Sequence, residues 1–324
     1  MIRISIFILW LVFNAFQVLA QTCCSGGIPL SSNIGFVGAE QSTWQFSTTY
    51  DYHYLNQLYK NSTKLEDKSR ARFTRSVIIE GGYQLTSSFS VDAFLPYIWQ
   101  EREIYHFGET DKAVTGGIGD IAVLFKYSLF FKDKGELQVA LGPKFPSGKS
   151  NIKSELGIAY NADLQPGSGT LDAIFAGSYS RAFTFRPTMS IFSRMLYKLN
   201  GTNKDYLDAF HYKFGNELQY ALGVSDQLLL GNFVISPSLV FRYRNVTMDE
   251  QDNVSFPNTG GDWIILNAGT GISVVKNLQF FLSGEIPVLT NVGGVQLSTT
   301  YRLTTGFYLW INNDRDVNFI PVKF

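Results

Sequence analysis

Apolar and polar side chains alternate along most of this chain with a period of two. Near the start of the pattern, Trp44, Phe46 and Tyr50 fall on one face of an extended backbone, whereas Gln45 and Asp51 fall on the other. Successive side chains of a β-strand point to opposite faces. Strict alternation over this length therefore predicts a strand with one apolar and one polar face.

The same alternation recurs in twelve segments. They span approximately residues 41–54, 72–84, 89–104, 119–131, 137–145, 169–182, 187–199, 208–222, 228–244, 262–274, 278–289 and 296–310. A tilted strand needs about 9–11 residues to cross a bilayer. Most of the segments are long enough, and the segment at 137–145 is the shortest.

The connections between these segments alternate in length. After the even-numbered segments they are short and turn-like, at residues 86–88, 132–135, 182–184, 223–226 and 275–277. After the odd-numbered segments they are mostly long and polar, as at residues 56–71, 106–118, 146–168 and 245–262. Short turns at one end and long loops at the other are typical of an outer-membrane barrel, whose short turns face the periplasm.

Composition separates this architecture from a soluble β-sandwich, which would have to bury every apolar face between two sheets. Apolar residues make up 45% of the chain and aromatic residues 15%, but charged residues only 17%, against about 25% in soluble domains. After residue 20 no stretch approaches 18 consecutive apolar residues, so no spanning helix is expected. The predicted fold is all-β: a transmembrane antiparallel up-and-down β-barrel of about twelve strands.

The ends of the chain fall outside this pattern. Arg3, a following apolar run, and small residues at Val18 and Ala20 predict a cleaved signal peptide over residues 1–20. A retained N-terminal anchor is the alternative. Residues 21–40 are expected to form a periplasmic or lumen segment before the barrel at 41–310, and residues 311–324 a C-terminal tail. The expected location is the outer membrane of a Gram-negative bacterium.

Several classes of chemistry are unsupported. The adjacent Cys23 and Cys24 cannot staple the fold, and three histidines are too few to suggest a metal cluster. A formal net charge of +0 gives no reason to expect a nucleic-acid partner. No cofactor is predicted. The expected partners are outer-membrane lipids, lipopolysaccharide, the barrel-assembly machinery and a small-molecule solute.

Charged residues on the polar faces are candidates for a pore lining, because they would point into the lumen. The predicted pore-lining residues are Lys126, Arg194, Lys213, Glu217, Arg242, Arg244, Glu285 and Arg302. The same charges could instead pair across the lumen and fill it. Eight-stranded barrels are packed shut and sixteen-stranded ones hold a channel, so about twelve strands leave a narrow pore and a plugged lumen both open.

Three glycine-rich patches resemble a known family. They are Gly-Gly-Ile-Gly-Asp at 116–120, Leu-Gly-Pro-Lys-Phe-Pro-Ser-Gly at 141–148, and Leu-Gln-Pro-Gly-Ser-Gly-Thr-Leu-Asp at 164–172. The series resembles the bacterial outer-membrane family labelled Putative MetA-pathway of phenol degradation, described as transporter-like, from about residue 75 to 310. The resemblance implies a barrel and passage of small solutes, including aromatic ones, and it supplies no catalytic residue.

An enzyme is the less favoured reading. Residues 142–150 imitate a phosphate-binding loop, but the spacing is one residue too long and Pro143 and Pro146 lack backbone donors. A lipid-cleaving barrel needs a serine activated by a histidine. His106 falls in a loop and His53 and His211 on polar faces. The leading hypothesis is a passive channel for small solutes. A closed structural or surface-binding barrel that acts through its loops is the alternative, and an outer-membrane hydrolase comes third.

Overall fold

The computed structural model describes residues 41–130 and 135–312. The predicted signal peptide and the 21–40 segment lie outside the described residues, as does residue 313 onward. Residues 311 and 312, which were predicted as the start of the tail, belong to the last strand. No helix in the described part of the chain has the length and apolar character needed to cross a membrane.

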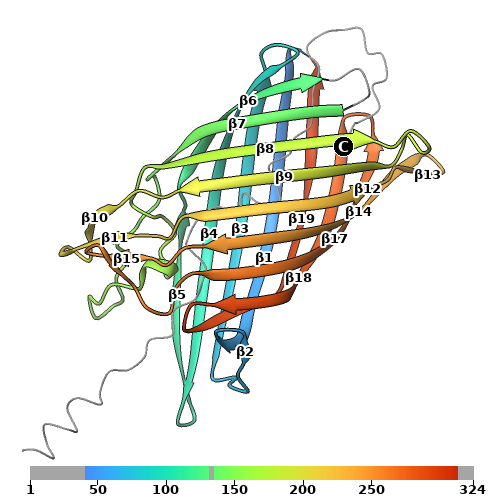
Figure 1. Cartoon of the computed structure of the whole chain (residues 1–324). Coiled ribbons are helices and arrows are strands. Elements are labelled where there is room, and N and C mark those ends of the chain that lie inside the picture. The colour runs from blue at the N-terminus through green and yellow to red at the C-terminus, as the bar shows by residue number, and fades with distance from the viewer. Residues whose placement is uncertain (1–40, 131–134, 313–324) are drawn as a thin grey trace, which may run out of the picture.

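Twelve long antiparallel strands close into a single barrel (Figure 1). They are β1 (Thr43–Lys60), β3 (Arg70–Gln84), β4 (Phe89–His106), β6 (Ile121–Phe130), β7 (Gly135–Phe145), β8 (Asp172–Ala182), β9 (Ser190–Leu199), β12 (Glu217–Ser225), β14 (Phe233–Val246), β17 (Gly261–Val275), β18 (Leu278–Val292) and β19 (Val295–Asn312). Each pairs with its neighbours in the chain, and β1 pairs with β19 to close the ring. Each of the twelve predicted segments overlaps one of these strands.

The predicted alternation of connections is confirmed. The short turns lie at one end of the barrel, here called the turn end, and the long connections at the other, the loop end. The loop end carries β2 (Thr63–Lys64), β5 (Glu109–Ile118), β10 (Asn203–Tyr206), β11 (Phe210–Lys213), β15 (Glu250–Gln251) and β16 (Val254–Ser255), and the turn end carries β13 (Leu228–Leu230) (Figure 1). One loop-end connection is short, at residues 293–294 between β18 and β19.

The two faces of the barrel wall differ as the alternation predicts. Large apolar side chains such as Phe125, Leu141 and Phe241 are exposed on the outside. Inward-facing polar side chains such as Ser47 and Gln138 are buried. A closed barrel pairs its backbone groups within the wall, which a hydrocarbon environment requires. The molecule is thus a transmembrane antiparallel barrel with an apolar outer surface and a polar lumen.

One predicted strand, residues 208–222, is partly wrong. Its first half forms β11, which belongs to a separate four-stranded sheet with β10, β15 and β16 at the loop end. Only the stretch from Glu217 joins the barrel, and it runs on to Ser225, into the predicted turn. Tyr212 and Phe214 were expected on the lipid face, but they are buried in the loops. Alternation alone cannot distinguish a strand that faces lipid from one that faces a small core.

The predicted loop at residues 106–118 is also ordered differently. Residues 109–118 form β5, which pairs with the far half of β4 from Tyr97↔Ile118 to His106↔Glu109. This hairpin extends beyond the barrel at the loop end (Figure 1). Its polar sequence is compatible with a strand because neither face of the projecting part has to meet lipid.

The wall is irregular near the loop end of β18 and β19. These two strands pair only up to Glu285↔Arg302, although both continue toward their connection. An apolar cluster of Val246, Trp263 and Val292 lies beside this stretch. The Trp263 indole donates to Ser298 Oγ at 3.1 Å, which links β17 to β19 across the end of β18. Side chains therefore connect strands here that the backbone does not.

Candidate functional site

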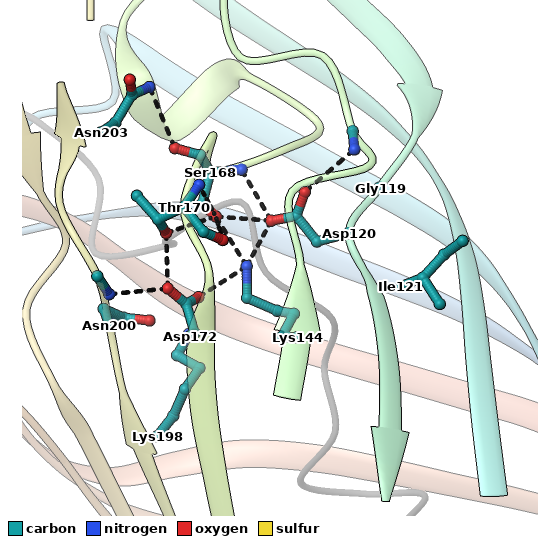
Figure 2. Close-up of polar contacts among 12 residues, drawn as sticks. Gly119, Asp120, Ile121, Lys144, Ser168, Thr170, Asp172, Lys198, Asn200 and Asn203 are labelled. Carbon is teal, nitrogen blue, oxygen red and sulfur yellow. Dashed lines mark hydrogen bonds and ion pairs between the residues drawn. The ribbon is translucent and has the colours of Figure 1, made fainter. Parts of the chain in front are cut away.

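The three glycine-rich patches meet in one buried polar cluster at the loop end of the lumen (Figure 2). Lys144, near the end of β7, forms ion pairs with Asp120 and with Asp172, the latter at 2.7 Å. Its ammonium group also donates to Ser168 Oγ at 2.8 Å. All four residues are buried. Burial of charge is tolerated because each group is paired and hydrogen-bonded.

The Asp120 carboxylate fixes two segments of the loop between β7 and β8 to the barrel wall. It accepts hydrogen bonds from the backbone N–H of Gly148 at 3.1 Å and of Ser168 at 2.9 Å. The Ser168 hydroxyl donates to the same carboxylate at 2.7 Å. Both ends of the loop that connects β7 to β8 are therefore fixed to one side chain.

Asp172 fixes the loop that follows β9 in a similar way. Its carboxylate accepts from the Thr170 hydroxyl at 2.6 Å and from the backbone N–H of Gly201 at 2.9 Å. The Asn203 side chain adds a hydrogen bond to the Ser168 carbonyl at 3.3 Å (Figure 2). The cluster thus joins the loops that follow β7 and β9.

Two glycines of the motifs are required by a close backbone crossing. A Cβ atom on Gly167 would lie 2.4 Å from the carbonyl carbon of Gly148, and a Cβ on Gly148 would lie 2.7 Å from the Cα of Gly167. No other residue fits where two backbones approach this closely. The glycine-rich character of both patches therefore has a packing cause.

Held in this way, residues 146–171 fold inward over the lumen. They include a short 3₁₀ helix, η1 (Ala162–Leu164), and residues 162–169 are almost all buried. Arg72 of β3 forms an ion pair with Asp163 at 2.7 Å, with 0% and 7% of the two side chains exposed. The Gln100 amide donates to the Gln165 carbonyl at 3.1 Å. We call residues 146–171 the lumen loop and the Arg72–Asp163 contact its latch.

The sequence predicted this segment only as a long polar loop on the outside. The fold inward depends on partners from β3 and β4, about 65 to 90 residues earlier in the chain. The only local indication is the pair of glycines at 167 and 169 beside Pro166, which marks a tightly bent backbone.

The loop-end sheet packs on the outer side of the lumen loop. Tyr206, Tyr212 and Phe214 form a buried cluster with Ala162, and the rings of Tyr206 and Tyr212 lie 4.7 Å apart. The Tyr212 hydroxyl donates to Asp249 at 2.5 Å. Burial raises the pKa of Asp249 to about 6. Burial likewise raises the pKa of Tyr206 to about 12. These groups form a cap that supports the lumen loop.

Most predicted pore-lining residues do point into the barrel, where they form ion pairs. Arg242 contacts Glu285 at 2.5 Å, and Arg302 lies 4.0 Å from the same carboxylate. Arg302 also pairs with Asp51 at 2.6 Å. This network crosses from β14 to β1 by way of β18 and β19.

Two further groups of ion pairs lie inside the barrel. Arg244 contacts Glu217 at 2.6 Å, and Lys198 approaches the same carboxylate at 3.4 Å. On the other wall Lys126 forms a buried ion pair with Asp92. The sequence identified Lys126, Arg244 and Glu217 as facing the lumen but not Lys198, and it could not assign the pairs.

Two predicted pore-lining residues behave differently. Lys213 lies on β11 in the loop-end sheet, 3.7 Å from Glu250, and is outside the barrel wall. Arg194 faces the lumen from β9, with its guanidinium 4.7 Å from the centre of the Phe192 ring. The set predicted from alternation therefore contains one residue of the loops and seven of the wall.

An apolar layer interrupts the polar lumen. Ile78, Phe94, Leu124, Ile174 and Leu196 are buried together in one cluster. Along β4 this layer separates the ion pair at Asp92, toward the turn end, from Gln100, toward the loop end. The loop-end half of the lumen is thus closed by side chains and by the lumen loop.

Some inward-facing side chains in the turn-end half of the lumen are part-exposed, namely Ser178, Arg194, Phe281, Tyr308 and Trp310. Others in the same half, such as Ser47, Gln138 and Gln279, are buried. These five side chains are part-exposed, whereas Arg72 and Lys144 are buried. The accessible part of the lumen is therefore polar and aromatic.

Comparison with known families agrees with this architecture. The family described as Putative MetA-pathway of phenol degradation matches residues 67–303. The chain belongs to this family. No curated protein matches the chain by sequence.

Comparison with solved structures finds a similar barrel. The COG4313 outer membrane channel from Pseudomonas putida F1 superposes with a TM-score of 0.68 at 10% identity, over 86% of this chain and 98% of that one. The β domain of the Bordetella autotransporter BrkA is less similar, with a TM-score of 0.48 at 11% identity, over 84% of this chain and 100% of that one. The first of these supports the twelve-stranded fold of this phenol-degradation family member.

In this family member the patches that carried the resemblance have a structural role. They supply Asp120, Lys144 and Asp172, whose buried cluster fixes the lumen loop. None of the three glycine-rich patches contributes to the part-exposed half of the lumen. The family motifs thus shape the loop-end closure, and the accessible lumen is built from other residues.

The residues considered for hydrolysis do not form a common site. His53 lies on β1 in the barrel wall, 2.8 Å from the Thr299 hydroxyl, whereas His211 lies on β11 in the loop-end sheet. Among the described residues, no group of His, Cys, Asp and Glu side chains is arranged to hold a metal ion.

Proposed function

We propose that this barrel lets small solutes, aromatic or hydrophobic ones included, cross the outer membrane of a Gram-negative bacterium passively. The observation that carries the proposal is the asymmetry of the lumen. Its turn-end half contains part-exposed polar and aromatic side chains, and its loop-end half is closed by a loop that side-chain contacts hold in place.

The size of the barrel sets the size of the solute. Twelve strands enclose less space than the sixteen of a water-filled porin, and the lumen loop and the ion pairs occupy part of it. The passage is therefore narrow. A solute that crosses it has to move side chains of the lumen loop, so small molecules are favoured over oligomers.

The apolar layer supports aromatic or hydrophobic solutes. Phe94, Leu124 and Leu196 offer no hydrogen-bond partner to a passing molecule. A strongly hydrated ion loses its water there at a high cost, whereas an aromatic ring does not. The family name, with its reference to phenol degradation, points in the same direction.

The surroundings of the channel follow from its surface. Exposed residues such as Phe125 and Phe241 would contact the acyl chains of the membrane. Lipopolysaccharide would lie against the outer leaflet, and the barrel-assembly machinery would insert the chain.

Reconstitution of the purified mature chain tests the proposal directly. Single-channel conductance in planar bilayers and swelling of liposomes in small aromatic solutes are both expected, and larger sugars should cause no swelling. A matched control replaces Val139, on the outer face of β7, with leucine, which should leave both signals unchanged. A folded protein that neither conducts nor admits any solute would contradict the proposal.

A second candidate is a barrel that binds a partner through its loops. The β4–β5 hairpin favours it, because Phe107 at the tip is fully exposed beyond the barrel. Shortening this hairpin to the level of Gln100 and Thr115 separates the two functions. Lost binding with unchanged solute passage supports the second candidate, and the opposite result supports the channel.

A further inference from the structure

Arg194 differs from the other charged residues of the lumen. Its guanidinium lies over the Phe192 ring, 4.7 Å from the ring centre. Within residues 41–130 and 135–312 it forms no ion pair with a carboxylate, whereas Lys126, Arg242, Arg244 and Arg302 each do. It is part-exposed, so a solute in the lumen can reach it.

Aromatic rings lie across the lumen from Arg194. Phe281 of β18 stacks on Tyr308 of β19 with ring centres 4.9 Å apart, and Tyr308 stacks on Trp310 at 6.0 Å. We call Phe192, Phe281, Tyr308 and Trp310 the ring belt.

Two glycines keep the ring belt against the wall. A Cβ atom on Gly223 would lie 2.5 Å from the Phe192 ring, and a Cβ on Gly306 would lie 2.8 Å from the Phe281 ring. Each ring therefore occupies the space above a glycine of the neighbouring strand, close to the barrel wall.

The acidic groups near this region are less accessible. Glu80 is buried and accepts a hydrogen bond from the Ser47 hydroxyl at 2.8 Å, and Asp92 is buried in its ion pair with Lys126. Their charge is partly neutralised and they offer no open contact. The charge that a solute meets at the ring belt is the guanidinium of Arg194.

From this arrangement we propose that Arg194 and the ring belt form a binding site for small planar organic anions, namely aromatic monocarboxylates. The inference rests on the proposed channel function and specifies its solute class. The carboxylate accepts two hydrogen bonds from the planar guanidinium, and the aromatic ring packs against the ring belt.

Both halves of the ligand are needed. Chloride or acetate meets the guanidinium but gains little from the rings. A neutral aromatic alcohol gains the ring contacts but leaves the guanidinium without a counter-charge. An aromatic carboxylate gains both, so it binds more tightly than either.

Equilibrium binding of benzoate to the full-length mature protein in detergent tests the site without requiring conduction. Fluorescence of the tryptophans, which include Trp310 in the belt, reports binding. Replacement of Arg194 by glutamine should weaken benzoate binding by about ten-fold or more, and lysine should restore part of it. The matched control is Arg181→Gln, because Arg181 is exposed near the same end of the barrel.

The second measurement compares the affinities for different ligands and the effect of a substitution in the ring belt. Acetate and benzyl alcohol should each bind at least about ten-fold more weakly than benzoate to the wild-type protein. Phe281→Leu should weaken benzoate but not acetate. Equal benzoate binding by the wild-type and Arg194→Gln proteins, both folded, would overturn the inference.

Conduction separates this inference from the proposed function. If the wild-type channel conducts and benzoate reduces its current, both are supported, and Arg194→Gln should remove the effect of benzoate. If the channel conducts but is equally insensitive to benzoate with and without Arg194, only the binding site fails. If benzoate binds but nothing crosses the membrane, the channel function fails and the site stands.

Discussion

The latch of the lumen loop offers a direct test of how the barrel is closed. The Arg72–Asp163 pair is almost fully buried, with its nearest N and O atoms 2.7 Å apart. Removing one partner of such a pair costs about 3–5 kcal/mol, because the other charge remains buried without compensation. Asp163→Asn should therefore raise the ratio of open to closed lumen loop by a factor of about 100 to several thousand.

Cysteine labelling measures that ratio. Leu164, within the lumen loop, is 0% exposed, so a cysteine placed there reacts with a membrane-impermeant maleimide only when the loop opens. Cys23 and Cys24 are first replaced by serine. The labelling rate should increase with Asp163→Asn and with Arg72→Met, and the single-channel conductance should increase with it.

A double variant distinguishes the latch from a general loss of stability. Once Arg72 is replaced by methionine, the Asp163 charge is unfavourable, so adding Asp163→Asn should slow labelling again. Lys112→Met removes an exposed ion pair on the β4–β5 hairpin and should leave the labelling rate unchanged. Additive effects of the two latch substitutions, or unchanged labelling in folded single variants, would refute this account.

Three further predictions concern the loop end. Gly148→Ala or Gly167→Ala should force the crossing backbones apart and increase labelling at Leu164, while the barrel keeps its heat-modifiable migration in gels. Lys144→Met leaves two carboxylates buried without a counter-charge and should cost about 3–5 kcal/mol, seen as a lower urea midpoint of unfolding. Because the pKa of Asp249 is raised from 3.8 to about 6, the folded cap binds a proton more tightly than the opened cap. Cap stability should be highest below pH 4 and fall by at most about 3 kcal/mol as the pH rises to 6. Hydrogen exchange of residues 203–216, corrected for intrinsic rates, should show this trend in the wild-type chain and lose it in Asp249→Asn.

The barrel itself could be predicted from the sequence because one local pattern decides it. Alternation fixes which side chains face outward, and the spacing of turns fixes the strand order, since each strand pairs with its neighbour in the chain. The outward Phe125 and inward Lys126 follow from parity alone. The pairing of strands that are neighbours in the chain can be predicted without knowledge of long-range contacts.

The candidate site could be predicted only in part. Arg194, Arg242 and Arg302 were found because they share the parity of the polar face. The latch was not found, because Arg72 and Asp163 are 91 residues apart and nothing local joins them. Lys213 was assigned to the lumen because β11 alternates like a barrel strand although it packs against loops.

The closing pair of strands has a consequence for biogenesis. β1 and β19 are matched from Thr43↔Asn312 to Lys60↔Val295, so the first strand made waits for the last before one of its edges is satisfied. An unpaired strand edge cannot remain in hydrocarbon. The edge of β1 therefore has to be satisfied by water or by another binding partner until the last strand has been made. A chain shortened by its final strand should stall before insertion rather than yield a smaller barrel.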